Sequence, residues 1–341
     1  MVAMPVSTTP AQPSPEGSAA PLVWVLHDGK AGMASQSLGL AEATGFGFIE
    51  KCLSVRAPWA YLPPQLWFAP LAAVSEGGLP LRPPWPDLVI GCGRNTAAPA
   101  LAIRRASGER TLAAQIQDPG IGGDAFDLMI VPEHDRRRGS RVITTKGALN
   151  RVTPEKLAGA RQLFPELAAL PRPILAVLIG GSNRAYRLTL DRLALVADGI
   201  AASLRDSGGA AVVTPSRRTG EAGIALLRER LAGLPATIWD MRGDNPYYAF
   251  LAVADAFLVT ADSVSMVSEA AMTGRPVHIV DLDGGDAKFA RFHRAMRDAG
   301  ITRPFAGRIE SWRYAPLDDT ARAGAALRAL VLDRIAARRV A

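Results

Sequence analysis

Residues 254–270 read ADAFLVTADSVSMVSEA, and this stretch decides the fold class. The part up to Thr260 is an apolar run typical of a buried strand. A polar turn follows, in which Asp262 or Ser263 suits the N-cap of a helix because its side-chain oxygen accepts from an unpaired amide. A strand that passes through a polar turn into a helix is the repeating unit of α/β folds.

The helix predicted after this turn has two different faces. One face is polar and carries Asp262, Ser265 and Glu269, whereas the face expected toward the sheet carries Val264, Val267 and Ala271. Free amides at a helix start bind phosphate, and a glutamate two turns later could accept from a ribose diol. We assign to nucleotide-sugar binding Asp262, Ser263, Ser265, Met266 and Glu269. Ordinary capping beside a solvated glutamate is the alternative.

The same alternation of apolar runs and helical periodicity continues along the chain and predicts parallel sheets. The expected strands are 22–26, 87–90, 111–116, 127–131, 141–144, 174–179, 211–214, 236–239, 256–260 and 277–280. A loop over 27–35 precedes the first predicted helix. Two prolines in 167–173 indicate a linker. The predicted divisions are a disordered tail (1–20), an N-terminal Rossmann-like domain (21–166), a C-terminal one (174–317) and a final helix packing back on the first domain (318–341).

Length and composition limit the classes of protein. A chain of 341 residues with 48% apolar and 21% charged residues suits two globular domains. No apolar run reaches the roughly 20 residues that span a bilayer, and the first 20 residues lack the basic start and apolar core of a secretory signal. We therefore expect a cytoplasmic protein, either free or peripheral to the inner membrane. Cys52 and Cys92 are expected to be reduced and structural.

The net charge of +7 favours anionic partners such as phosphates and nucleotides. No zinc spacing, RNP-like aromatic motif or helix-turn-helix signal supports nucleic acid as a partner. No cysteine–histidine cluster indicates a metal, and no P-loop or GxGxxG fingerprint indicates an NTPase or an NAD enzyme. We predict neither a metal nor a cofactor.

Two further turns follow predicted strands of the second half. In Gly180-Gly181-Ser182-Asn183, paired glycines would let backbone amides approach an anion. In 214–219, Arg217 and Arg218 stand beside hydroxyls and suit a diphosphate, although a surface turn is the alternative. Their place at carboxyl strand ends, where open α/β sheets bind ligands, favours a role in nucleotide-sugar binding for all six residues.

The first half gathers titratable side chains at strand ends. We assign to catalysis the imidazoles and carboxylates His27, Asp28, Asp118 and His134. A general base must come from such a set, although each of them alone is more often structural. We assign to acceptor binding the neighbouring polar residues Lys30, Arg94 and Asn95.

Residues 57–74 place Trp59, Tyr61, Trp67 and Phe68 among four prolines. Aromatic side chains favour the membrane interface, so the Trp59–Phe68 segment is a candidate contact for a membrane surface or a lipid-linked acceptor. An irregular, partly buried loop is the plainer interpretation.

These residues resemble the mitochondrial fission family of the elongated-mitochondria type, whose bacterial members are described as glycosyltransferases or nucleoside-diphosphate-sugar epimerases. The resemblance covers about 23–305. Its motifs are HDGKAG at 27–32, GCGR at 91–94, QIQDP at 115–119, PEHD at 132–135, GGS at 180–182, NPY at 245–247 and DSVSMVSEA at 262–270. Members of the family usually have arginine after the Asp-Pro pair, where this chain has Gly120.

The second half is also similar to the nucleotide-binding domain of the lipid-linked peptidoglycan glycosyltransferases. Gly180-Gly181-Ser182 matches the turn that holds the donor diphosphate there, and Glu269 followed by Gly274-Arg275-Pro276 matches the segment that grips the uridine ribose. Asp262-Ser263 replaces that family's Arg-Ala-Gly. The resemblance implies an α/β, GT-B-like fold of two Rossmann-like domains whose parallel sheets face each other across a cleft.

The leading hypothesis is a metal-independent glycosyltransferase that uses a nucleoside-diphosphate sugar, with UDP-sugar favoured. His27, Asp28 or Asp118 would activate the acceptor, and positive helix ends would stabilise the leaving diphosphate. A nucleotide-sugar epimerase on the same fold is one rival. A non-catalytic interaction protein, which the fission role of the plant relatives implies, is the other.

Overall fold

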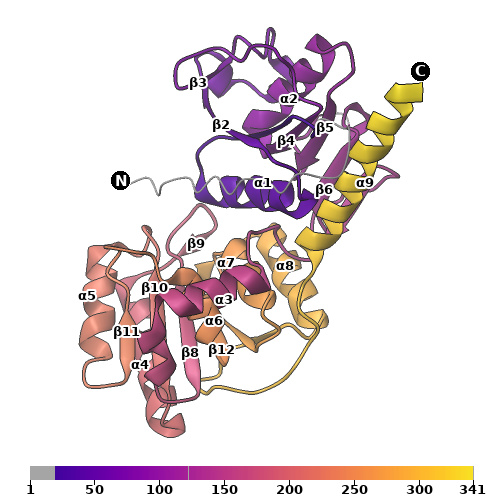
Figure 1. The fold of residues 1–341 in the computed structure, drawn as a ribbon. Coiled ribbons are helices and arrows are strands. Elements are labelled where there is room, and N and C mark those ends of the chain that lie inside the picture. Colours follow the sequence, from indigo (N-terminus) through magenta and orange to yellow (C-terminus); the bar gives the residue numbers. More distant parts are fainter. Residues whose placement is uncertain (1–19, 122, 341) are drawn as a thin grey trace.

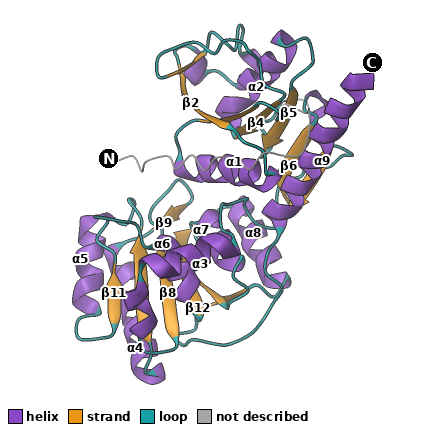
Figure 2. Cartoon of the chain, in the orientation of Figure 1, coloured by secondary structure: helices purple, strands orange, loops and turns teal. Residues whose placement is uncertain are grey.

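The computed structural model describes residues 20–121 and 123–340, and in this part the chain forms two α/β domains (Figure 1). The predicted tail over 1–20 lies, except for Ala20, outside the described residues. Apolar strands are sandwiched between helices in each domain (Figure 2). The predicted α/β class, with two Rossmann-like domains built on parallel sheets, is confirmed.

The N-terminal sheet has the described strand order β3-β2-β1-β4-β5-β6-β7, with only β3 antiparallel to its neighbour. Its strands are β1 (Val23–His27), β2 (Ile49–Val55), β3 (Val74–Glu76), β4 (Leu88–Cys92), β5 (Leu112–Ile116), β6 (Leu128–Pro132) and β7 (Val142–Thr145). Its helices are α1 (Ala31–Thr44) and α2 (Arg94–Ala106), with short turns η1 (Trp59–Tyr61), η2 (Pro64–Leu66) and η3 (Gly123–Ala125). The four central strands β1, β4, β5 and β6 are buried along their whole length, which explains their continuous apolar runs.

The C-terminal sheet has the described strand order β11-β10-β8-β12-β13-β15, and all its pairs are parallel. Its strands are β8 (Ile174–Ile179), β10 (Ala210–Pro215), β11 (Ala236–Ile238), β12 (Ala256–Thr260), β13 (Val277–Val280) and β15 (Thr302–Pro304); β9 (Tyr186–Arg187) and β14 (Asp283–Gly284) form a separate antiparallel pair. Its helices are α3 (Pro154–Leu163), α4 (Leu190–Ser207), α5 (Gly220–Arg230), α6 (Tyr247–Val253), α7 (Val264–Ala271) and α8 (Ala287–Asp298), with the turn η4 (Pro165–Ala169).

Both sheets reverse their strand order beside the first strand of the domain, between β1 and β4 and between β8 and β12. Open α/β sheets bind ligands outside the carboxyl ends of the strands at such a switch point. The topology therefore singles out the residues that follow these four strands.

Two boundaries differ from the prediction. Helix α3 packs on α6, and Val152 and Leu167 belong to the core of the second sheet. The predicted end of the first domain at 166 is therefore wrong, because the chain enters the C-terminal core at about 152. Helix α1 begins at Ala31, inside the predicted loop over 27–35.

Helix α9 (Asp319–Val340) returns to the N-terminal domain, along which it runs in Figure 1, and packs against α1 through Leu327 and Val331. At its start, the Asp319 carboxylate accepts from the amides of Lys146 and Gly147 at 2.9 and 3.0 Å. The next amide, that of Ala148, donates to the Ser268 hydroxyl of α7 at 2.8 Å. Residues 146–148, which lie between the domains, are thus hydrogen-bonded to the start of α9 on one side and to α7 on the other.

Candidate functional site

The switch point of the N-terminal domain holds Asp28 after β1 and Asn95 at the start of α2. The Asn95 side-chain amide donates to Oδ2 of Asp28 at 3.1 Å, and the Lys30 ammonium pairs with the same oxygen. Only 11% of the Asp28 side chain is exposed. These three residues, assigned from sequence to catalysis and acceptor binding, therefore form one polar cluster.

His27 also lies at this strand end but is turned away from Asp28 by its own hydrogen bonds. Its Nδ1 accepts from the Gly29 amide at 3.1 Å, so its Nε2 carries the proton and donates to the Glu50 carboxylate at 2.7 Å. Its side chain is 4% exposed, whereas that of Glu50 is 47% exposed. Because both ring nitrogens are occupied, His27 lacks the free acceptor that a general base needs.

Asp118 and His134 share no hydrogen bond with this cluster, and His134 lies beside helix α8 of the other domain. Burial acts to raise the pKa of Asp118, but the hydrogen bonds from Arg137 and the Gly120 amide hold it below its usual value. The ring of His134 packs edge-on against Phe292 of α8, and burial lowers its pKa to about 4. Nearby, Lys288 of α8 pairs with Asp135 at 3.0 Å. His134 therefore contributes to the contact between the domains, whereas the ion pair of Asp118 lies within its own domain.

The switch point of the C-terminal domain is organised by Asp262. Its buried carboxylate accepts from the Gly181 amide at 3.0 Å and from the Thr260 hydroxyl at 2.6 Å, and it pairs with Arg218 at 2.7 Å. An added Cβ at Gly180 would lie 2.3 Å from this carboxylate, and one at Gly181 would lie 2.5 Å from the Arg218 carbonyl. The paired glycines therefore make room for Asp262 and Arg218.

This geometry corrects the sequence interpretation of the Gly-Gly-Ser turn. The Gly181 amide, expected to meet a diphosphate, is already bonded to a carboxylate. Asn183 and Ser182 also bond within the turn, to the amides of 185, 186 and 188. Arg218 donates to the Gly181 carbonyl at 2.8 Å, whereas Arg217 is exposed. The Gly181 amide of this turn therefore already holds a carboxylate of the protein itself.

Amides without a hydrogen bond lie at two helix starts, one from each domain, that come close together. Ser263 caps α7 by accepting from the Met266 amide at 3.3 Å, while Lys30 at the start of α1 makes no side-chain cap. Within the described residues, no hydrogen bond is found for the amides of Ala31, Gly32, Val264 and Ser265. A Cβ added to Gly32 would lie 3.5 Å from the Ser265 hydroxyl, so the first turns of α1 and α7 adjoin each other. Two helix dipoles thus point their positive ends at one place.

Glu269 stands further along α7 and bonds to α6. The Tyr247 hydroxyl donates to its carboxylate at 2.5 Å. Burial raises the pKa of Glu269 to about 7, although the hydrogen bond from Tyr247 acts in the opposite direction. Met266 is half-buried against the core of the domain. Glu269 therefore changes charge near neutral pH, where it could accept from a ligand hydroxyl.

Sequence reasoning missed Glu50 and Tyr247 as site residues. Tyr247 stands in the NPY motif of 245–247, which was a usable signal. Glu50 lies on β2, a strand with a mixed polar sequence, and its pairing with His27 needs the fold. Within the described residues, no group of three histidine, cysteine or acidic side chains is placed to hold a metal ion. In the same residues, no helix is both long and apolar enough to cross a membrane.

Comparison with known proteins extends these observations. The model of the family "Mitochondrial fission ELM1" matches residues 31–331. The mitochondrial fission protein ELM1 of Arabidopsis thaliana is 33% identical over 270 residues, which are 71% of this chain and 63% of the relative, so the chain spans less than two thirds of that protein. An uncharacterized protein of Rickettsia prowazekii is 26% identical over 87% of this chain and 95% of its own length.

A solved structure with a similar fold is the UDP-GlcNAc 2-epimerase from Methanocaldococcus jannaschii. Its TM-score is 0.58 at 12% sequence identity, and the match covers 91% of this chain and 99% of the epimerase. At this identity the likeness concerns the fold, which is the two-domain GT-B arrangement expected from the sequence. Because the family model matches most of the chain, the protein belongs to the mitochondrial fission ELM1 family.

Proposed function

We propose that the protein binds a nucleoside-diphosphate sugar between its domains and transfers the sugar to an acceptor hydroxyl. The observation that carries this proposal is the junction of α1 and α7 at Gly32 and Ser265. Backbone amides and helix dipoles at this junction suit the diphosphate. Glu269, on the same helix, suits a ribose diol. The fold shared with a UDP-GlcNAc 2-epimerase is compatible with this class of ligand.

In the proposed reaction, Asp28 is the general base. Its carboxylate would take the proton of the acceptor hydroxyl as that oxygen attacks the anomeric carbon, and the bond from that carbon to the diphosphate oxygen would break. The nucleoside diphosphate would leave with its charge facing the amides of α1 and α7 and the Lys30 ammonium. Asn95 would orient Asp28 through the 3.1 Å hydrogen bond. His27 would hold the Gly29 turn and Glu50 in place.

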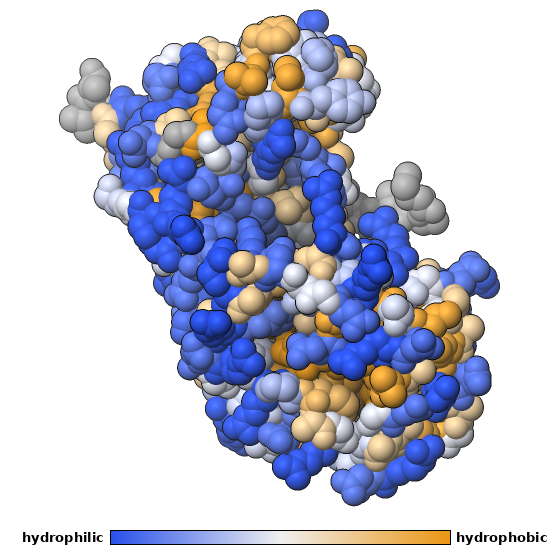
Figure 3. Space-filling model, turned by 180° about the vertical axis from the view of Figure 1, so that it is seen from behind, coloured by the Kyte–Doolittle hydropathy of each residue, from blue (hydrophilic) through white to orange (hydrophobic). Residues whose placement is uncertain are grey.

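A lipid-linked acceptor fits the surface beside this cluster. Tyr61, Leu66 and Phe68 are 85%, 61% and 63% exposed. Figure 3 shows from behind that apolar side chains reach the surface of the N-terminal domain. Arg94, next to Asn95, donates to the Leu62 carbonyl at 2.8 Å and so ties this segment to the start of α2. We propose that the apolar part of the acceptor lies on this segment while its hydroxyl reaches Asp28.

Product analysis tests the proposed transfer. The protein is incubated with UDP-sugars, with and without a membrane-lipid extract, and the nucleotide products are separated by chromatography. Transfer predicts UDP release that depends on the lipid and falls at least about a hundredfold in Asp28→Asn. An Asp118→Asn variant should retain activity, because that carboxylate pairs with Arg137 instead. Failure of every UDP-sugar to release UDP would overturn the proposed activity.

A nucleotide-sugar epimerase is the second candidate, favoured by the carboxylate of Asp28 and the His27–Glu50 pair, which lie at the end of the same strand. An epimerase needs groups beside the bound sugar but no acceptor. It predicts an isomeric UDP-sugar in the assay without lipid. Binding of the nucleotide with neither product would instead favour the interaction protein.

A further inference from the structure

A second charged groove lies on the C-terminal domain, between α5 and the loop that follows β11. Its volume is about 610 Å³. Arginines contribute from the turn after β10, from α5 and from the loop: Arg217, Arg228 and Arg242. Ile224 and Met241 add apolar side chains to its lining. The lining therefore combines exposed basic side chains with half-buried apolar ones.

The three arginines are free to bind an anion. All three are exposed, and within the described residues none of their guanidinium groups makes an ion pair or hydrogen bond. Arg230, on the same helix, instead pairs with Asp198 at 2.8 Å. The acids of the groove are Glu221 and Asp240, and one oxygen of Asp240 accepts from the Arg242 amide at 2.9 Å. The positive charges of the groove are thus incompletely balanced.

The groove follows one face of α5. Gly220, Ile224 and Arg228 are spaced by four residues, so they lie above one another along the helix. Eight residues of helix span about 12 Å. The groove is therefore long enough for an organic phosphate whose body lies along Ile224 and whose phosphate reaches Arg228.

The loop opposite α5 is held in an unusual conformation. Met241 has φ of 67°, in the left-handed region that side chains other than glycine rarely adopt. The Trp239 indole donates to the Arg242 carbonyl at 3.0 Å and closes the turn around it. Strained residues of this kind gather at ligand sites, and here the turn places Met241 and Arg242 together on the groove.

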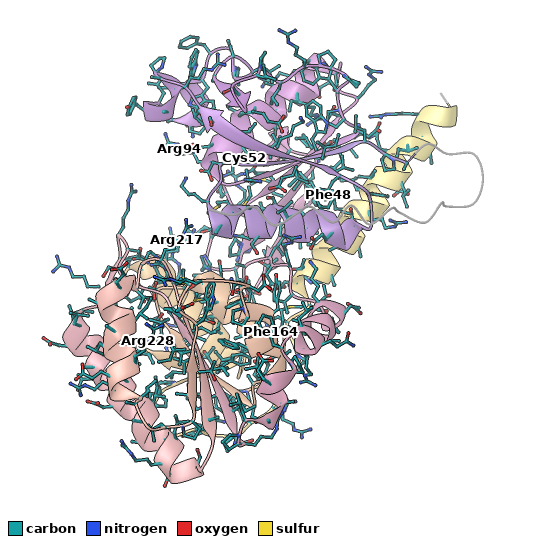
Figure 4. All side chains as sticks on the ribbon, turned by 60° about the vertical axis from the view of Figure 1, so that its left-hand side comes forward. Phe48, Cys52, Arg94, Phe164, Arg217 and Arg228 are labelled. Atoms are coloured by element: carbon teal, nitrogen blue, oxygen red, sulfur yellow. The ribbon has the colours of Figure 1, made fainter. Side chains whose placement is uncertain are left out.

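The groove is distinct from the junction of α1 and α7. It lies at the ends of β10 and β11, which stand outside the switch point of the sheet. Arg218 turns inward to Asp262, whereas its neighbour Arg217 lines the groove. Figure 4 shows Arg217 at the end of the domain that faces Arg94, with Arg228 further along α5.

We propose that this groove is a second binding site, for an organic phosphate, that operates independently of the site between the domains. The guanidinium groups of Arg228 and Arg242 hold the phosphate in paired hydrogen bonds. Arg217 adds charge, and Ile224 and Met241 contact the apolar body of the ligand.

Calorimetric titration of the full chain with phenyl phosphate tests this site. Wild type binds it more tightly than inorganic phosphate, because the ring adds apolar contact. Each arginine contributes about tenfold, so the double variant Arg228→Gln/Arg242→Gln binds phenyl phosphate about a hundredfold more weakly. Arg230→Gln is the matched control on the same helix and keeps wild-type affinity.

A third variant, Gly32→Leu, separates the two sites because it fills the junction of α1 and α7. Phenyl phosphate binding is unchanged in this variant, whatever its effect on nucleotides. Loss of binding there would mean that the phosphate occupies the junction and would overturn the proposal. Unaltered binding by the double variant, or no binding by wild type, would also overturn it.

Discussion

The carboxylate of Asp262 lies 3.0 Å from the backbone nitrogen of Gly181, in the position of an anion bound to a glycine-rich turn. It also pairs with Arg218 and leaves no room for a side chain at Gly180. An acidic residue at 262 and glycine at 180 are therefore parts of one structural unit. We therefore expect a bound phosphate to meet the amides at the start of α7 and not the Gly181 amide.

We expect Asp262→Ala to destabilise the protein by roughly 3 kcal/mol, because it leaves the Gly181 amide and Arg218 without their buried partner. The matched control is Asp198→Ala, which removes an exposed ion pair with Arg230 and should cost less than about 1 kcal/mol. Urea denaturation of both variants measures the difference. Equal losses would show that Asp262 has no special structural role.

Two glycine-to-alanine variants give a second test of the unit formed by Asp262 and Gly180. Gly180→Ala should cost about 1–3 kcal/mol, because its Cβ would lie 2.3 Å from the Asp262 carboxylate. Gly159→Ala, in α3 with no atom within 4 Å of the added Cβ, should instead be neutral or gain up to about 1 kcal/mol. Thermal unfolding of the two variants compares them directly. A stable Gly180→Ala protein would contradict the packing described here.

Glu269 should make stability fall as the pH rises. Its pKa is raised from 4.5 to about 7 in the folded protein, so between these values the folded state holds a proton that the unfolded state has lost. Stability therefore decreases from about pH 5 to pH 8, by at most a few kcal/mol. Urea denaturation across this range should show a smaller decrease in Glu269→Gln, which stays neutral. Parallel curves for the two proteins would argue against a raised pKa.

His134 should act in the opposite direction. Its pKa is lowered from 6.5 to about 4, so between these values the unfolded state binds the proton and the folded state does not. Stability should therefore be lost as the pH falls from 6.5 toward 4. In His134→Phe, which keeps a ring against Phe292, this acid loss should be smaller. Urea denaturation of both proteins at pH 4.5, 5.5 and 6.5 makes the comparison. An equal loss of stability at low pH in the two proteins would contradict a lowered pKa of His134.

Much of the fold was visible in the sequence because buried parallel strands are continuous apolar runs. Strands β8, β12 and β13 begin and end at the predicted residues. Strand β2 was missed because its sequence IEKCLSV mixes charged and apolar residues, and most of its side chains are exposed. Helix α8 was also missed, although Phe289, Phe292 and Met296 have a helical spacing that could have revealed it.

The site was predicted in part. The sequence identified the residues that follow the strands at both switch points, since these turns are polar and short. It could not show that Asp262 fills the Gly-Gly-Ser turn, because the two segments are some 80 residues apart. For the same reason, the pairing of His27 with Glu50 and the separation of Asp118 from Asp28 required the structure. The assigned roles in catalysis and nucleotide binding remain predictions.

Calorimetric titration with UDP tests the central claim most directly, with wild type compared to Gly32→Ala, Gly32→Leu and Glu269→Ala. Since the Cβ of alanine at 32 would lie at an ordinary contact distance of 3.5 Å from Ser265, Gly32→Ala should bind UDP like wild type. Gly32→Leu and Glu269→Ala should each bind it at least about tenfold more weakly, because the first obstructs the helix starts and the second removes the ribose acceptor. Absence of UDP binding in wild type, or equal affinity in all four proteins, would contradict a nucleotide site between α1 and α7.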